Sequence, residues 1–158
     1  MPHIHDKYDF TVSAFIIHPN KPKLCLHYHK KLRKWLQPGG HIELNEDPLE
    51  ALEHELLEEA GLRLSDCEII GSPKVPNIRG QKNLPLPVHL NVHDFNSSHK
   101  HIDFQYLIKS KISILKPQEG ESPIIKWFTI DEITEVYKTG EIFDGTFDIC
   151  EWIFNEYM

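Results

Sequence analysis

Three glutamates, Glu55, Glu58 and Glu59, lie three and four residues apart in a segment with helical spacing of its apolar residues. On a helix they share one flank, with Glu55 and Glu59 only ~6 Å apart along the axis, where like charges repel. Mg²⁺ relieves such repulsion, because it binds carboxylate oxygens and completes its shell with water and phosphate oxygens. The spacing therefore predicts a magnesium site suited to phosphoryl chemistry, with a solvated acidic helix face as the alternative.

A helix over residues 48–60 is the element that would position these glutamates. Asp47 is a suitable N-cap, Pro48 fits the first helical position, and Glu50 completes a capping box. Apolar residues recur at helical spacing and would face the core; they are Leu49, Leu52, Leu56 and Ala60. Gly61 supplies the C-terminal stop.

The segment Gly40–Leu62 resembles the signature of the Nudix family. That signature is a glycine, five residues, a glutamate, seven residues, an arginine, a glutamate, an aliphatic residue, any residue, two glutamates, any residue, a glycine and an aliphatic residue. This chain matches it with Gly40, Glu46, Glu55, Leu56, Glu58, Glu59, Gly61 and Leu62. Trp35–Gly40 also looks like the usual entry to the signature, and Lys126–Phe128 resembles the late strand, so the resemblance extends along most of the chain.

The resemblance implies an α/β fold, namely a Nudix-like α/β/α sandwich with a mixed β-sheet, formed by a single domain over residues 1–158. It also implies Mg²⁺- or Mn²⁺-dependent hydrolysis, in which water attacks a phosphorus of a nucleoside diphosphate joined to another moiety. Glu58 and Glu59 match the principal metal ligands of the family. Glu55 matches the residue that binds a further metal ion or helps to activate water.

Supporting residues are implied in the same way. Glu46 matches the residue that supports the helix start, and the carbonyl of Gly39 or Gly40 matches a backbone metal ligand. The absence of side chains there would also let the backbone approach substrate phosphates closely. Family members often recruit one more acid from a distal loop, for which Glu121 is the first candidate and Glu119 the second.

One position departs from the family pattern, because His54 stands where arginine is usual. Arginine is permanently charged and offers forked donors, whereas histidine donates one bond from each nitrogen and is charged only if its pKa is raised. Either His54 still orients a catalytic glutamate, or the domain is a nucleotide-binding module with little catalysis. The retention of every carboxylate favours an enzyme, a pyrophosphohydrolase acting on acid anhydrides.

Histidines outside the signature form a second pattern. His99, His101 and Asp103 alternate along one predicted strand, and His89 and His93 share a face of another. We expect His101 and Asp103 to contact substrate phosphate or a second cation, as in some members of the family. Solvated surface histidines are the alternative.

Composition limits the class of protein. The 158 residues, 40% hydrophobic and 26% charged, suit one globular domain. A net charge of −7 argues against a stable nucleic-acid partner, although a cation could bridge the protein to a nucleotide-like diphosphate. Residues 1–6 lack a signal-peptide pattern, and no apolar run is long enough for a bilayer, so we expect a cytoplasmic protein without a membrane partner. A small acidic interaction domain and a homodimer both stay open.

The remaining pattern predicts a mixed sheet covered by helices. Strands are expected at 9–18, 23–29, 67–74, 88–95, 103–112 and 124–128, and further helices at 130–138 and 146–157. The proline-rich segment 73–87 and the segment 96–101 are expected loops, and they are the predicted determinants of substrate choice.

Overall fold

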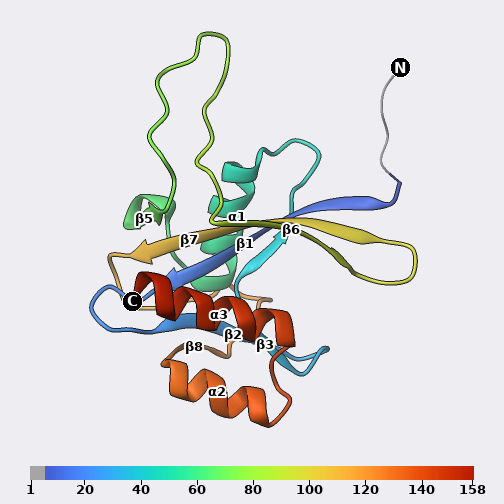
Figure 1. Ribbon diagram of the computed structural model, residues 1–158, viewed down its shortest axis with the longest axis vertical. Helices are drawn as coiled ribbons and strands as arrows, with labels where there is room; N and C mark the ends of the chain where they lie inside the picture. Colours follow the sequence, from blue (N-terminus) through green and yellow to red (C-terminus); the bar gives the residue numbers. More distant parts are fainter. Residues whose placement is uncertain (1–5) are drawn as a thin grey trace.

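The computed structural model describes residues 6–158, which form a mixed eight-stranded sheet with helices on both faces (Figure 1). The strands are β1 (Tyr8–Ile17), β2 (Leu24–His29), β3 (Lys34–Leu36), β4 (Gly39–His41), β5 (Cys67–Ile70), β6 (His89–Asp94), β7 (Lys100–Ser110) and β8 (Ile125–Phe128). The helices are α1 (Pro48–Ala60), the short 3-10 helix η1 (Leu64–Asp66), α2 (Ile130–Lys138) and α3 (Asp144–Tyr157).

The sheet is centred on β1 and β7, which pair in parallel along the whole of β1. The main strand order is β3-β2-β1-β7-β5, while β4 pairs with β1, β6 with β7 and β8 with β2. All pairings other than β1 with β7 are antiparallel. The sheet divides beside β1, because β2 meets only its last residue whereas β4 lies along Thr11–Ser13.

Two apolar layers follow from the alternation of side chains along β1. Val12 and Ile16 pack with Leu52 and Leu56 of α1 on one face of the sheet. Phe15 belongs to the opposite layer, which includes residues of α2 and α3. The predicted α/β/α sandwich with a mixed sheet is therefore confirmed.

Most element boundaries agree with the sequence analysis to within a few residues, and α1 spans 48–60 as predicted. The Gly39–Gly40 segment differs, because it belongs to a strand, β4, that pairs with β1 and was not among the expected strands. Strand β7 begins at Lys100, three residues before its expected start, because pairing with β1 continues back to Tyr8. Residues 1–5, which bear on the expectation about a signal peptide, lie outside the described part.

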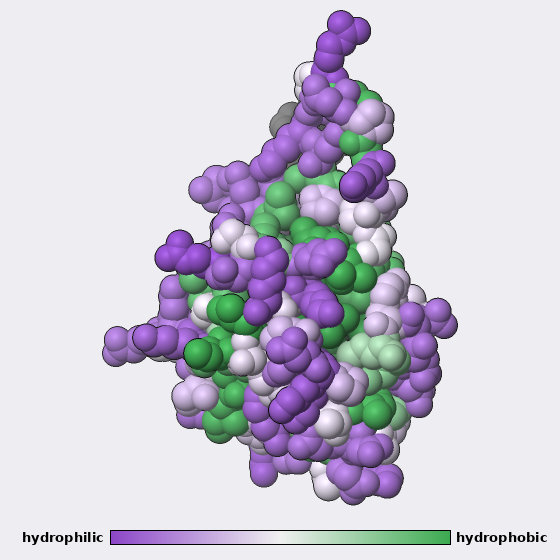
Figure 2. Space-filling model, turned by 90° about the vertical axis from the view of Figure 1, so that its left-hand side faces the viewer, coloured by the Kyte–Doolittle hydropathy of each residue, from purple (hydrophilic) through white to green (hydrophobic). Residues whose placement is uncertain are grey.

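The segment between β5 and β6 is a long loop that stands away from the sheet at the top of Figure 1. Hydrophilic residues cover its tip in the space-filling view (Figure 2). No helix within residues 6–158 is both long and apolar enough to cross a membrane.

Candidate metal and catalytic site

Helix α1 is fixed at both ends by the residues predicted to cap it. Asp47 accepts hydrogen bonds from the backbone N–H groups of Leu49 and Glu50, and the Glu50 side chain accepts one from the backbone of Asp47. Gly61 closes the helix with a left-handed φ of 69°, which glycine adopts without steric cost. The ends thus set the rotation of the helix and direct its glutamates toward β4.

The two glycines of β4 allow a close approach between the strand and α1. A Cβ atom at Gly40 would lie 2.2 Å from Oε1 of Glu55, and one at Gly39 would lie 2.3 Å from the carbonyl oxygen of Val12. The Gly39 N–H also donates to Oε2 of Glu59 over 3.3 Å. Any side chain at Gly40 would displace the Glu55 carboxylate, so this position is required by the site itself.

Glu59 is largely enclosed, with 11% of its side chain exposed. Burial and the neighbouring Glu55 carboxylate raise the pKa of Glu59 to about 8. Its Oε2 lies 3.2 Å from Nε2 of His27, whose pKa burial lowers to about 4. Both shifts favour the uncharged forms, so in the absence of a cation the contact has the character of a hydrogen bond between neutral partners more than of an ion pair.

Glu55 is a second carboxyl group in this region whose pKa is raised. Burial is the main cause of its raised pKa, and the nearby Glu58 and Glu121 carboxylates raise it further. Glu121 has the same effect on Glu59. The distal loop therefore brings Glu121, the first candidate for an additional acid, close to the helix glutamates.

Glu121 also borders a hollow of about 320 Å³ that opens next to the site. Its lining comprises His27, Tyr28, His29, Lys30, Lys31, Gly120, Glu121, Ser122 and Pro123. The two lysines could attract an anionic group to the edge of the carboxylate cluster.

His54 bridges two of the predicted carboxylates. Its Nδ1 lies 3.0 Å from Oε1 of Glu46, and its Nε2 lies 2.8 Å from Oε1 of Glu58. The hydrogen bond to Glu58 raises the pKa of His54, which favours the doubly protonated ring that donates from both nitrogens. His54 therefore makes the two-sided contact that a forked arginine could make at this position, while Glu58 points away from Glu59 toward the imidazole.

His101 and Asp103 lie on one face of β7 but in different surroundings. Asp103 is 3% exposed and accepts hydrogen bonds from Thr11, Ser13 and Gln105. His101 is half-buried nearer the open end of the sheet, in contact with other histidines. The structure thus separates this predicted pair into a buried network and an accessible cluster.

His27 was not among the sequence-predicted site residues. The alternation of β2 shows which face it occupies, but its contact with Glu59 depends on the packing of α1 across the sheet. A sequence pattern that reports only local spacing carries no signal for this contact.

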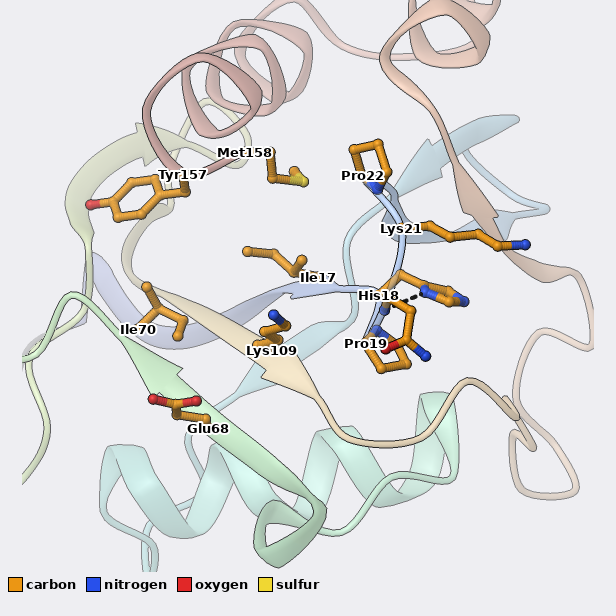
Figure 3. Close-up of a pocket in the computed structure, with 11 residues that line it drawn as sticks. Ile17, His18, Pro19, Lys21, Pro22, Glu68, Ile70, Lys109, Tyr157 and Met158 are labelled. Atoms are coloured by element: carbon orange, nitrogen blue, oxygen red, sulfur yellow. Dashed lines mark hydrogen bonds between the residues drawn. The ribbon is translucent and has the colours of Figure 1, made fainter.

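A larger hollow than the one beside Glu121 lies elsewhere, between the ends of β1, β5 and α3 (Figure 3). It has a volume of about 520 Å³, and its lining includes Ile17, Glu68, Lys109 and Tyr157. None of the predicted site residues lines it. We therefore assign the site by the carboxylates and their electrostatics and not by pocket size.

A mixed-sheet sandwich that packs a capped, glutamate-bearing helix against a glycine-glycine strand has the architecture of a Nudix domain. Residues 7–147 match the profile of the NUDIX domain family, and the chain belongs to that family.

Relatives of known structure or named activity agree with this assignment. A crystal structure of a NUDIX-family hydrolase from Clostridium perfringens has 32% identity and a TM-score of 0.74, covering 93% of this chain and 96% of that one. A probable DHNTP pyrophosphohydrolase of Lactococcus lactis is 29% identical over 138 residues, or 82% of this chain and 70% of the relative. An RNA pyrophosphohydrolase of Helicobacter pylori is 42% identical over 62 residues, which is 37% of this chain and 40% of the relative.

Proposed function

We propose that the chain is a pyrophosphohydrolase that uses Mg²⁺ or Mn²⁺ to hydrolyse a diphosphate linkage in a nucleoside-diphosphate-like substrate. The observation that carries the proposal is the buried Glu59 carboxylate, which lies close to Glu55 and next to the two glycines of β4. Without a cation its pKa is raised to about 8, so the fold places an acid where its charged form is unfavourable. Family membership and pyrophosphohydrolase relatives support the same reaction.

The residues present fit a divalent cation. Glu55 and Glu59 repel one another when ionised, and a cation between them would offset both that repulsion and the cost of burial. Glu58 is 36% exposed; its Oε1 lies against His54, and its second carboxylate oxygen is available to the cation. The donor set is oxygen only, which suits Mg²⁺ and Mn²⁺. When bound, such an ion supplies neutralisation of phosphate charge and a lower pKa for water.

The chain's own residues then have separate tasks. Glu59 and Glu58 would hold the cation, together with the carbonyl of Gly39 or Gly40. Glu55, which packs directly on Gly40, accepts the proton of the attacking water. His54 holds the side chains of Glu46 and Glu58 in position near the helix start through one contact to each. Glu121 contributes a further oxygen from its loop.

Substrate choice is assigned to the long loop between β5 and β6. The loop carries Lys74, Arg79 and Lys82 and no acidic residue between Gly71 and Val88. Lys82 pairs with Asp47 over 2.6 Å, which places the loop beside the start of α1, and the exposed Lys74 and Arg79 would attract a polyphosphate toward the acidic site. Triphosphates are therefore the first class to test, in keeping with the DHNTP pyrophosphohydrolase and the RNA pyrophosphohydrolase to which the chain is similar.

The test is turnover on a substrate panel with Mg²⁺ and with Mn²⁺, in wild type and in the Glu58→Gln and Glu59→Gln variants. The panel includes dihydroneopterin triphosphate, 5′-triphosphorylated RNA, nucleoside triphosphates, nucleotide sugars, dinucleoside polyphosphates and ADP-ribose. We expect the wild type to cleave a diphosphate linkage only when the metal ion is present. Both variants should lose this activity. Nucleotide-induced thermal stabilisation without turnover on any member would instead support a binding module.

A further inference from the structure

A second cluster of potential metal ligands lies on the open part of the sheet. Asp9 of β1, His41 of β4 and His101 of β7 each offer one ligand atom, and these atoms lie within 4.8 Å of one another. The strand register explains the grouping, because Asp9 pairs with His101 and His41 pairs with Thr11, two residues further along β1. Three strands that are far apart in sequence therefore deliver side chains to one face.

The cluster is distinct from the glutamate site. Successive residues of a strand point to opposite faces of the sheet, and Gly40 faces Glu55. His41, the next residue, therefore points to the other face. The glutamates and the histidines occupy opposite sides of the same short strand, β4.

The rings of the cluster are held in place by neighbouring aromatic side chains. Phe95 stacks on His101 with ring centroids 4.7 Å apart and planes 15° apart. His41 and His93 meet the same ring edge-on, at 5.1 and 5.3 Å. Nε2 of His101 is buried and has no hydrogen-bond partner within residues 6–158. A buried ring nitrogen without a partner costs free energy unless something binds it.

We propose that Asp9, His41 and His101 bind one transition-metal ion of the Zn²⁺ type. Two imidazoles and a carboxylate form a donor set that prefers Zn²⁺ to Mg²⁺, unlike the oxygen-only glutamate site.

The geometry needs only a small adjustment to hold such an ion. Ligands at bond lengths of about 2.0–2.2 Å in a tetrahedral shell lie roughly 3.4 Å apart, so the widest gaps must shorten by ~1 Å or a little more. Asp9 and His41 are 41% and 54% exposed and can make this movement, while His101 stays fixed under Phe95. Three protein ligands would leave one position of a tetrahedral shell for another ligand. An anionic ligand could occupy this position.

The test measures Zn²⁺ binding in a protein from which the other sites have been removed. The background carries Glu55→Gln, Glu58→Gln and Glu59→Gln, and also His3→Ala and His5→Ala so that the N-terminal histidines cannot contribute. We expect one equivalent of Zn²⁺ by calorimetric titration. Co²⁺ substitution should give a visible absorption band, and Zn²⁺ should raise the Tm.

The His41→Asn and His101→Asn changes, each added to this background, should weaken Zn²⁺ binding by more than ~100-fold. This expectation follows because removing even a group that only supports a ligand costs about 10- to 100-fold. His41 is exposed, so its replacement leaves the fold intact even if His101→Asn lowers stability. His89→Asn on neighbouring β6 is the matched control and should bind like the background.

Two outcomes would overturn the assignment. One is the absence of Zn²⁺ binding in the background protein, and the other is binding that survives both His41→Asn and His101→Asn. Neither result depends on turnover, because the catalytic glutamates are absent from the background. Loss of the proposed hydrolase activity and loss of this site would therefore be recognised separately.

Discussion

Two buried carboxylates on opposite faces of the sheet, Asp103 and Glu59, have contrasting surroundings. Asp103 is 3% exposed and is surrounded by neutral donors, namely the hydroxyls of Thr11 and Ser13 and the amide of Gln105. Glu59, with 11% of its side chain exposed, has a 3.3 Å bond from a backbone N–H and the His27 imidazole at 3.2 Å, but burial and the adjacent Glu55 carboxylate raise its pKa. The difference teaches that burial alone does not mark a cation site; burial beside a second carboxylate does.

The largest expected effect would come from replacing Glu59. Glu59→Gln should reduce kcat by more than ~100-fold, because loss of a direct metal ligand exceeds the roughly 10- to 100-fold cost of losing a supporting group. Glutamine is neutral and nearly isosteric, so the Tm of the cation-free protein should stay the same or rise. Steady-state kinetics and a thermal melt check both points. Wild-type turnover in Glu59→Gln would place the metal elsewhere.

A pH titration of stability sharpens the contrast. The pKa of Glu59 is raised from 4.5 to about 8, so its stabilising contribution is complete below pH 4.5 and is lost as pH rises toward 8. Between pH 6.5 and 8 the loss is at most ~2 kcal/mol, from one and a half pH units at about 1.36 kcal/mol each. His27, with its pKa lowered to about 4, loses stability only as pH falls below 6.5, so it does not contribute in this window.

Urea unfolding of EDTA-treated protein at several pH values measures this effect. Wild type should lose stability from pH 6.5 to 8, and saturating Mg²⁺ should offset the loss at pH 8. Glu59→Gln is the matched control, and its stability should change less over the same interval. Parallel curves for the two proteins would show that Glu59 does not retain its proton.

Asp103 should respond in the opposite sense. Asp103→Asn places an amide N–H₂ against donors and leaves buried groups unsatisfied, which costs about 1–3 kcal/mol of unfolding free energy. At a temperature where the variant is folded, its kcat should stay within a few-fold of wild type. A steep fall in turnover with unchanged stability would return Asp103 to the substrate-contact role that the sequence suggested.

Local patterns in the sequence were sufficient for the part of the site carried by α1. The cap at Asp47, the stop at Gly61 and the helical spacing of the glutamates depend on residues close in the chain. Contacts between distant strands were not accessible in this way. His27 reaches Glu59 across the sheet, and Asp9 meets His101 only because β1 and β7 run in parallel. Strand register is a long-range property, and alternation alone does not specify it.

The smallest expected effect concerns His54, and its pH dependence is more informative than its size. A protonated imidazole donates to both Glu46 and Glu58, whereas a neutral ring has one N–H and must release one of the two carboxylates. The pKa of His54 is raised, mainly by its hydrogen bond to Glu58, so both contacts persist to a higher pH than for an ordinary histidine and then weaken.

His54→Arg keeps a permanent charge and should have equal or slightly higher kcat/KM than wild type at neutral pH. The ratio of wild-type to variant activity should fall as pH rises through the raised pKa of His54, because only the wild type then loses a donor. His54→Gln, which has no charge at any pH, should show a constant ratio to His54→Arg. Comparison within this series cancels the pH dependence of Glu55, Glu59 and the attacking water, which all three proteins share. A steep loss of turnover in folded His54→Arg would mean that the imidazole itself, and not its two-sided contact, is required.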